Sequence, residues 1–152
     1  MAKIEQLLLV AKLAEEEEQQ AARLLKQAAD RVMAEEQQET LLQQYRFDYL
    51  HQLRSRGNGG MGSAVYIQFQ QFLERLDGVI VGQQQKISEA RRAQIERKAQ
   101  WDRSRQKRNA IDLLIEKSKA AKALKESRLE QKQADEFSSQ QLVRRLMSAR
   151  NS

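Results

Sequence analysis

The sequence predicts an all-α protein in which two long helices fold back on each other as an antiparallel coiled-coil hairpin. The chain of 152 residues has 32% charged and 5% aromatic residues and no proline, a composition typical of long helices. Apolar residues recur at alternating steps of three and four on both sides of the stretch "RSRGNGGMGS" (54–63), which holds four of the six glycines. Intrinsic disorder is the alternative for so polar a chain, but a disordered chain has no reason to keep this phase.

The first helix is predicted at about residues 3–55. Steps of three and four that start at Ile4 end at Leu53, and eleven of the fifteen positions are apolar, which is a sustained heptad seam. The fifteen positions are Ile4, Leu7, Ala11, Ala14, Glu18, Ala21, Leu25, Ala28, Val32, Glu35, Glu39, Leu42, Arg46, Tyr49 and Leu53.

The glycine-rich residues 56–63 are predicted to form the bend. Gly57 suits the left-handed residue that closes a helix, and the Ser63 hydroxyl can cap the start of the next one. A short turn between two long helices brings them side by side and antiparallel. With the bend centred near Asn58 and Gly59, the numbers of facing residues should sum to roughly 117.

The second helix is predicted at about residues 64–147. Its seam runs from Tyr66 to Trp101, and eight of the eleven positions are apolar. The positions are Tyr66, Phe69, Leu73, Leu76, Ile80, Gln83, Ile87, Ala90, Gln94, Arg97 and Trp101. Because this phase dissolves after Ile115, the second helix should overhang its partner beyond about residue 115. The whole chain, 1–152, is thus interpreted as a single coiled-coil hairpin.

Charge is unevenly distributed between the two arms. Residues 1–55 carry 7 basic and 10 acidic side chains, whereas residues 86–132 carry 15 basic and 7 acidic ones. The opposite net charges favour pairing within one chain, and the basic surplus could meet an acidic partner or nucleic acid. A basic coiled-coil nucleic-acid-binding protein is therefore one alternative function, although acidic residues are interleaved with the basic ones. A coiled coil that opens and dimerises is another.

The residues that carry chemistry predict no enzyme, cofactor or metal site. Cysteine is absent, and the single histidine, His51, has no second metal ligand near it. The glycine patch lacks the lysine and the strand-to-helix context of a phosphate-binding loop, and two helices form no deep pocket for a small-molecule substrate. The apolar run 7–11 is too short for a membrane span, so we expect a cytoplasmic protein.

One stretch, "QQFLERLDGVIVGQ" (70–83), departs from the simple hairpin pattern. Phe72, Val79 and Val81 are apolar but lie beside the seam, and Gly78 and Gly82 each cost about 1 kcal/mol relative to alanine in a helix. Exposed apolar residues of this kind indicate a docking surface. The alternative is a local irregularity of the helix near the bend.

Three stretches resemble the FliJ family of flagellar export proteins: "AARLLKQA" (21–28), "YIQFQQFLERLDGVI" (66–80) and "ESRLEQKQADEFS" (126–138). The resemblance implies a role in flagellum biogenesis, and thereby chemotaxis, through a coiled coil like that of the rotary ATP synthase gamma subunit. It implies a non-enzymatic, monomeric stalk within the hexameric export ATPase that also contacts the membrane-embedded export gate and helps to cycle export chaperones. Such a protein would be peripheral at the cytoplasmic face of the inner membrane. The equivalent stalk of a virulence-type III secretion system is the alternative.

The resemblance also implies two partner-binding sites. The face that binds the export gate corresponds to Phe72, Leu76, Val79 and Gln83. By analogy with the gamma subunit, the ATPase ring would meet the open end of the hairpin, at Ile4, Leu7, Ala11, Ile111 and Ile115.

Overall fold

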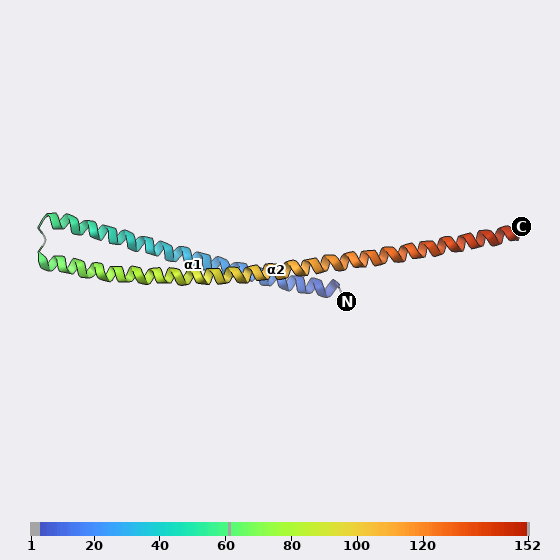
Figure 1. Ribbon diagram of the computed structural model, residues 1–152, viewed down its shortest axis with the longest axis horizontal. Helices are drawn as coiled ribbons and strands as arrows, with labels where there is room; N and C mark the ends of the chain where they lie inside the picture. The colour runs from blue at the N-terminus through green and yellow to red at the C-terminus, as the bar shows by residue number, and fades with distance from the viewer. Residues whose placement is uncertain (1–3, 61, 152) are drawn as a thin grey trace. The chain divides into compact units, whose positions relative to one another are not determined.

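The computed structural model describes residues 4–60 and 62–151, and nearly all of them are helical. Helix α1 spans Ile4–Asn58 (55 residues) and helix α2 spans Ser63–Arg150 (88 residues), joined by a short linker (Figure 1). No strand occurs within these described ranges. The two helices pack against each other, so the chain is an all-α helical hairpin.

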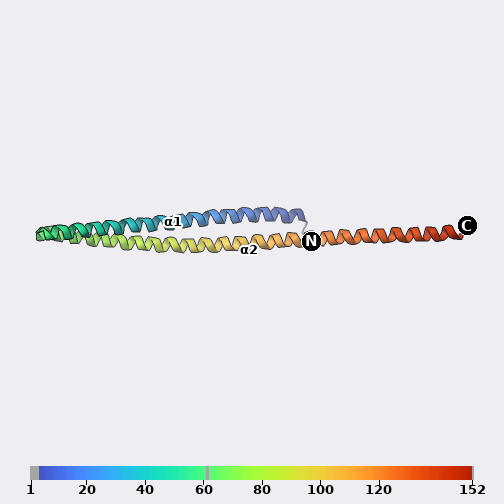
Figure 2. The ribbon, with the colours of Figure 1, turned by 90° about the horizontal axis from the view of Figure 1, so that it is seen from above.

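Contacts divide the chain into two units, and α2 contributes to both. The bend unit comprises Glu16–Arg105, and the end unit comprises the described residues of 1–15 and 106–152. Within the bend unit, α1 and α2 run alongside each other away from the linker, as two perpendicular views show (Figures 1 and 2).

The apolar seams form the contact between the helices. All fifteen seam positions predicted for α1 are buried or half-buried, and so are ten of the eleven predicted for α2. Tyr66 is the exception at 46% exposure, since it lies in the first turn of α2. The buried side chains of the bend unit are those of Val32, Phe69, Leu76, Ile80, Gln83, Ile87 and Ala90. The period of about 3.5 residues therefore predicts correctly which face of each helix is buried against the other helix.

The bend lies later in the chain than its glycines suggested. Helix α1 continues through Gly57 to Asn58, and the positive φ of 86° belongs to Gly60. The prediction that Gly57 takes the left-handed conformation was wrong. The backbone N–H of Gly59 donates to the carbonyl of Arg56 at 3.0 Å, which lets the helix close through a tightened last turn before the chain reverses.

The start of α2 also differs from the prediction. The N–H of Tyr66 donates to the carbonyl oxygen of Gly62 at 3.1 Å, so Gly62 holds the N-cap position and Ser63 is already the first helical residue. Ser63 was expected to be the cap. At its other end α2 continues to Arg150, three residues beyond the expected end.

The later bend changes which residues face each other. Tyr45 contacts Phe72 as a facing sum of 117 requires, but Arg46 pairs with Asp77 rather than with residue 71. The linker between Asn58 and Ser63 is centred about two residues beyond the expected point, which moves the facing residues of α2 toward its C-terminus.

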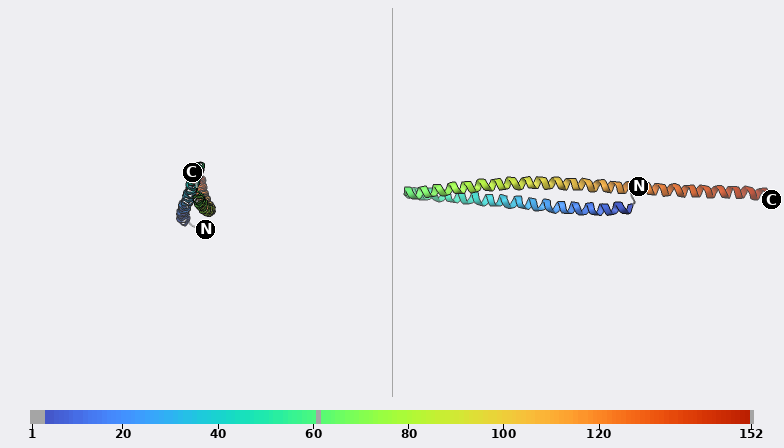
Figure 3. Two further views of the ribbon diagram at one scale, coloured as in Figure 1. Left: turned by 90° about the vertical axis from the view of Figure 1, so that its left-hand side faces the viewer. Right: turned by 90° about the horizontal axis from the view of Figure 1, so that it is seen from below.

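In the end unit the beginning of α1 packs on the middle part of α2 (Figure 3). Ala14, Ile111 and Ile115 form a buried cluster, with Leu7 and Ala11 packed against it. Further along α2, every residue from 119 to 151 is exposed. This part of the helix buries no side chain against another described segment of the chain.

Candidate partner-binding surfaces

A layer of polar contacts crosses the interface between the helices in the bend unit. Nε2 of Gln83, which is only 6% exposed, donates to the carboxylate Oε2 of Glu35 at 2.7 Å and to the carbonyl oxygen of Glu35 at 2.9 Å. Because a buried amide without partners is costly, these bonds favour the register in which the two residues meet.

Ion pairs flank this layer on partly exposed positions. Arg46 Nε lies 2.6 Å from Asp77 Oδ1, and Arg91 Nη2 lies 2.9 Å from Glu36 Oε1. The hydrogen bond to Asp77, together with its negative charge, raises the pKa of Arg46 above its ordinary value. The guanidinium is therefore charged throughout the physiological pH range, and such exposed pairs contribute mainly to register and little to stability.

Aromatic rings fill the interface between the polar layer and the bend. The ring of Tyr49 lies between Phe69 and Phe72, with centroid distances of 4.8 Å and 4.5 Å. The Arg56 guanidinium lies 5.6 Å from the centroid of the Phe69 ring. Large rings in contact stabilise an interface that has few other buried side chains.

The four residues that the family resemblance assigned to gate binding share one side of α2, because they are four, three and four residues apart. They differ in accessibility. Leu76 and Gln83 are buried against α1, Phe72 is half-buried among tyrosines, and Val79 is 55% exposed. This side of α2 is thus the edge of the interhelical seam, and Val79 is its most accessible member.

Gly78 and Gly82 lie on the exposed face of α2 next to Val79 and Val81. A Cβ atom added to either glycine would meet no atom within 4 Å, and neither has a positive φ. Neither packing nor backbone conformation within the chain explains the glycines. Val81, 62% exposed, lies on the other flank of the same face.

In the end unit, the five residues assigned to the ATPase contact face inward. Ile111 and Ile115 are buried, whereas Ile4, Leu7 and Ala11 are half-buried. The accessible apolar surface comes from other side chains, which sequence reasoning missed because it followed only the seam. We call this set the apolar collar: Leu8, Leu9, Val10, Leu13, Leu113 and Leu114, each 44–61% exposed.

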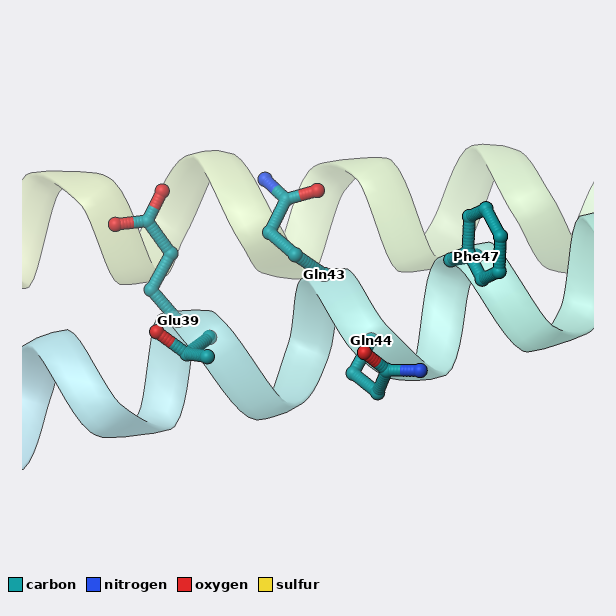
Figure 4. A pocket seen from close by; sticks show the side chains of 5 residues that line it. Glu39, Gln43, Gln44 and Phe47 are labelled. Carbon is teal, nitrogen blue, oxygen red and sulfur yellow. The ribbon is translucent and has the colours of Figure 1, made fainter.

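Sites for a small ligand or a metal ion are not evident among the described residues. The groove of Figure 4 is lined by Glu39, Thr40, Gln43, Gln44 and Phe47, all from successive turns of α1, and it does not enclose a ligand. No group of three His, Cys, Asp or Glu side chains that could hold a metal is found in residues 4–60 and 62–151. Nor does either helix, as described, contain a segment long and apolar enough to cross a membrane.

Comparison with known proteins bears on the helical hairpin as a whole. Residues 3–146 match the family model described as "Flagellar FliJ protein". The chain is also 30% identical over 105 residues to the "Flagellar FliJ protein" of Escherichia coli (strain K12), an alignment that covers 69% of this chain and 71% of that protein. With the match extending over both helices and the linker, the chain belongs to the flagellar FliJ protein family, a non-catalytic component of flagellar protein export.

Proposed function

We propose that this chain is a stalk of the flagellar export apparatus that engages the hexameric export ATPase through the apolar collar. The observation that carries the proposal is a set of six large apolar side chains, exposed on both helices of the end unit. Several large apolar side chains exposed within a few turns of two packed helices are typical of protein interaction sites. The seam residues first assigned to this contact, such as Ile111 and Leu7, pack together between the two helices and leave the more exposed collar side chains to engage the ring.

The mechanism is binding with different affinity to different states of the ring. A stalk changes the turnover of an ATPase when its contacts favour one arrangement of the subunits over another, and it needs no catalytic residue of its own. The pairing of α1 and α2 supports this role, because packed helices can hold the collar side chains in fixed positions.

Stimulation of the purified export ATPase tests the collar. Leu9→Asp together with Leu13→Asp should abolish stimulation, since both side chains are more than half exposed and a carboxylate there opposes docking in an apolar site. Leu41→Asp is the matched control, because Leu41 is 65% exposed on the same helix but lies in the bend unit. Stimulation that survives the double substitution, or that Leu41→Asp removes equally, would reject the collar as the contact.

The second contact that we propose is with the membrane-embedded export gate, through the side of α2 that carries Phe72, Leu76, Val79 and Gln83. Val79 provides the accessible apolar group, while the buried Leu76 and Gln83 hold that side of the helix in place. We propose that the same apparatus-bound protein assists export chaperones and is peripheral at the cytoplasmic face of the inner membrane, as the family resemblance implies.

Two valines of similar exposure allow a matched test of the gate contact. Val79→Asp should abolish binding to the purified cytoplasmic part of the gate, whereas Val81→Asp, on the other flank of α2, should leave binding unchanged. Circular dichroism must show equal helicity in both variants. Equal binding by the two variants would mean that the side of α2 with Val79 is not the gate contact.

A further inference from the structure

The C-terminal segment of α2, residues 137–150, has an apolar face with no partner among the described residues. Leu142, Val143, Leu146 and Met147 are 50–63% exposed. Leu142 and Leu146 are four residues apart, as are Val143 and Met147, so the four side chains share one side of the helix. The segment is therefore amphipathic, with an apolar stripe about two turns long.

The charge of this segment is entirely positive. Arg144, Arg145 and Arg150 are its three charged residues, and the last acidic side chain of the chain is Glu136. Arg144 and Arg145 project from the half of the helix opposite the apolar stripe, given about 100° of rotation per residue. In contrast, residues 119–136 mix five basic with four acidic side chains.

A coiled-coil partner fits this segment poorly. Continued at steps of three and four beyond Ile115, the seam reaches Ser118, Lys122, Lys125, Leu129 and Lys132, and lysines at three of these five positions oppose pairing with another helix. Within residues 137–150 the same steps reach Ser139, Val143, Leu146 and Arg150, of which only two are apolar. An apolar stripe of only two turns adds little to such pairing. A short apolar face with two arginines, Arg144 and Arg145, on the other side is instead typical of helices that lie in a lipid interface.

We propose that residues 137–150 bind directly to the surface of an anionic phospholipid bilayer. The apolar stripe enters the boundary between headgroups and acyl chains, and the arginines contact lipid phosphates. The segment lies on the membrane and does not span it. This contact deepens the peripheral membrane location proposed above, on which it rests, but it requires neither the ATPase nor the gate.

Co-sedimentation of the full-length chain with vesicles tests the proposal. The chain should bind vesicles of phosphatidylglycerol and phosphatidylethanolamine and should not bind vesicles of phosphatidylcholine alone, since each basic residue near an anionic surface strengthens binding by roughly fivefold. Equal binding to both kinds of vesicle, or binding to neither, would overturn the proposal.

Two pairs of variants identify the segment. Leu142→Gln with Leu146→Gln should remove most of the binding, whereas Leu124→Gln with Leu129→Gln, at exposed positions earlier in α2, should not. Replacing Arg144, Arg145 and Arg150 by Gln should weaken binding on the order of 100-fold, and replacing Lys119, Lys122 and Lys125 by Gln should weaken it clearly less.

Equal losses within either matched pair would show that general charge or apolarity of α2 attracts lipid, and would reject the assigned segment. All of the substituted side chains are exposed, so the interface between the helices should be unaffected and the circular dichroism spectrum unchanged. The collar consists of other residues, so the variants in residues 137–150 should lose vesicle binding and still stimulate the ATPase normally. That result would separate this proposal from the stalk function.

Discussion

Gly78 and Gly82 should be replaceable by alanine with a gain in stability. Both lie inside α2 with helical backbone, and a Cβ atom at either position enters open space. Alanine should therefore contribute its full helix propensity, about 1 kcal/mol in the free energy of unfolding at each site. The double variant should gain about 2 kcal/mol, because the two new methyl groups are small and contact no other side chain.

Gly60→Ala provides the matched control. Its added Cβ atom also meets nothing within 4 Å, so the space available is the same as at Gly78. Its φ is 86°, however, and the left-handed conformation costs a non-glycine residue roughly 1–2 kcal/mol. We thus expect the same substitution to stabilise the protein in α2 and to destabilise it in the linker.

Urea denaturation followed by far-UV circular dichroism measures these changes. The midpoint should rise for Gly78→Ala and Gly82→Ala and fall for Gly60→Ala, with the slope against urea concentration unchanged. In thermal unfolding, each kcal/mol should shift the midpoint by roughly 2–4 °C for a chain of this size. A loss of stability at Gly78 or Gly82 would refute the reasoning, because it would require a contact on that face of α2.

Three further substitutions test the interface in the bend unit. Gln83→Ala should lower the free energy of unfolding by about 1–2 kcal/mol in the same urea titration, because its two part-buried hydrogen bonds are lost. Gln84→Ala is the control and should change the free energy of unfolding by less than about 0.5 kcal/mol, because its hydrogen bond is exposed. Tyr49→Ala should cost about 2–3 kcal/mol, because its ring packs against two phenylalanines. Tyr45→Ala should cost clearly less by thermal melting, because Tyr45 is 53% exposed. Ala90→Leu should cost about 1–3 kcal/mol, since Ala90 is 0% exposed and a larger side chain there must displace its neighbours; an unchanged melting temperature would contradict the packing described.

Much of the fold could be predicted from periodicity. An apolar residue every 3.5 positions defines the inward face of a helix whatever lies opposite, and all fifteen predicted positions from Ile4 to Leu53 are at least half-buried. The exposed state of the chain beyond residue 118 also follows, because the pattern loses its phase there.

The candidate surfaces could be predicted only in part. Phe72, Leu76, Val79 and Gln83 lie on one side of α2, as their spacing requires, but spacing does not tell which of them α1 covers. The accessibility of a side chain on α2 depends on which part of α1 faces it. It therefore depends on the register between the helices, which the sequence of neither seam specifies alone. The apolar collar could not be predicted for a related reason. Its side chains lie outside the seam of their own helix, and the seam alone does not tell which of the other positions are exposed.

The residues alone indicate two helices, their inward faces and their reversal near a glycine patch, because these features depend on contacts between neighbours in sequence. Three other features are determined only by the tertiary structure. These are the positive φ at Gly60, the pairing of Gln83 with Glu35, and the exposure of Val79 beside a buried Leu76. Each of these features depends on the register of one helix along the other. That register is determined by many weak contacts between residues that are distant in the chain.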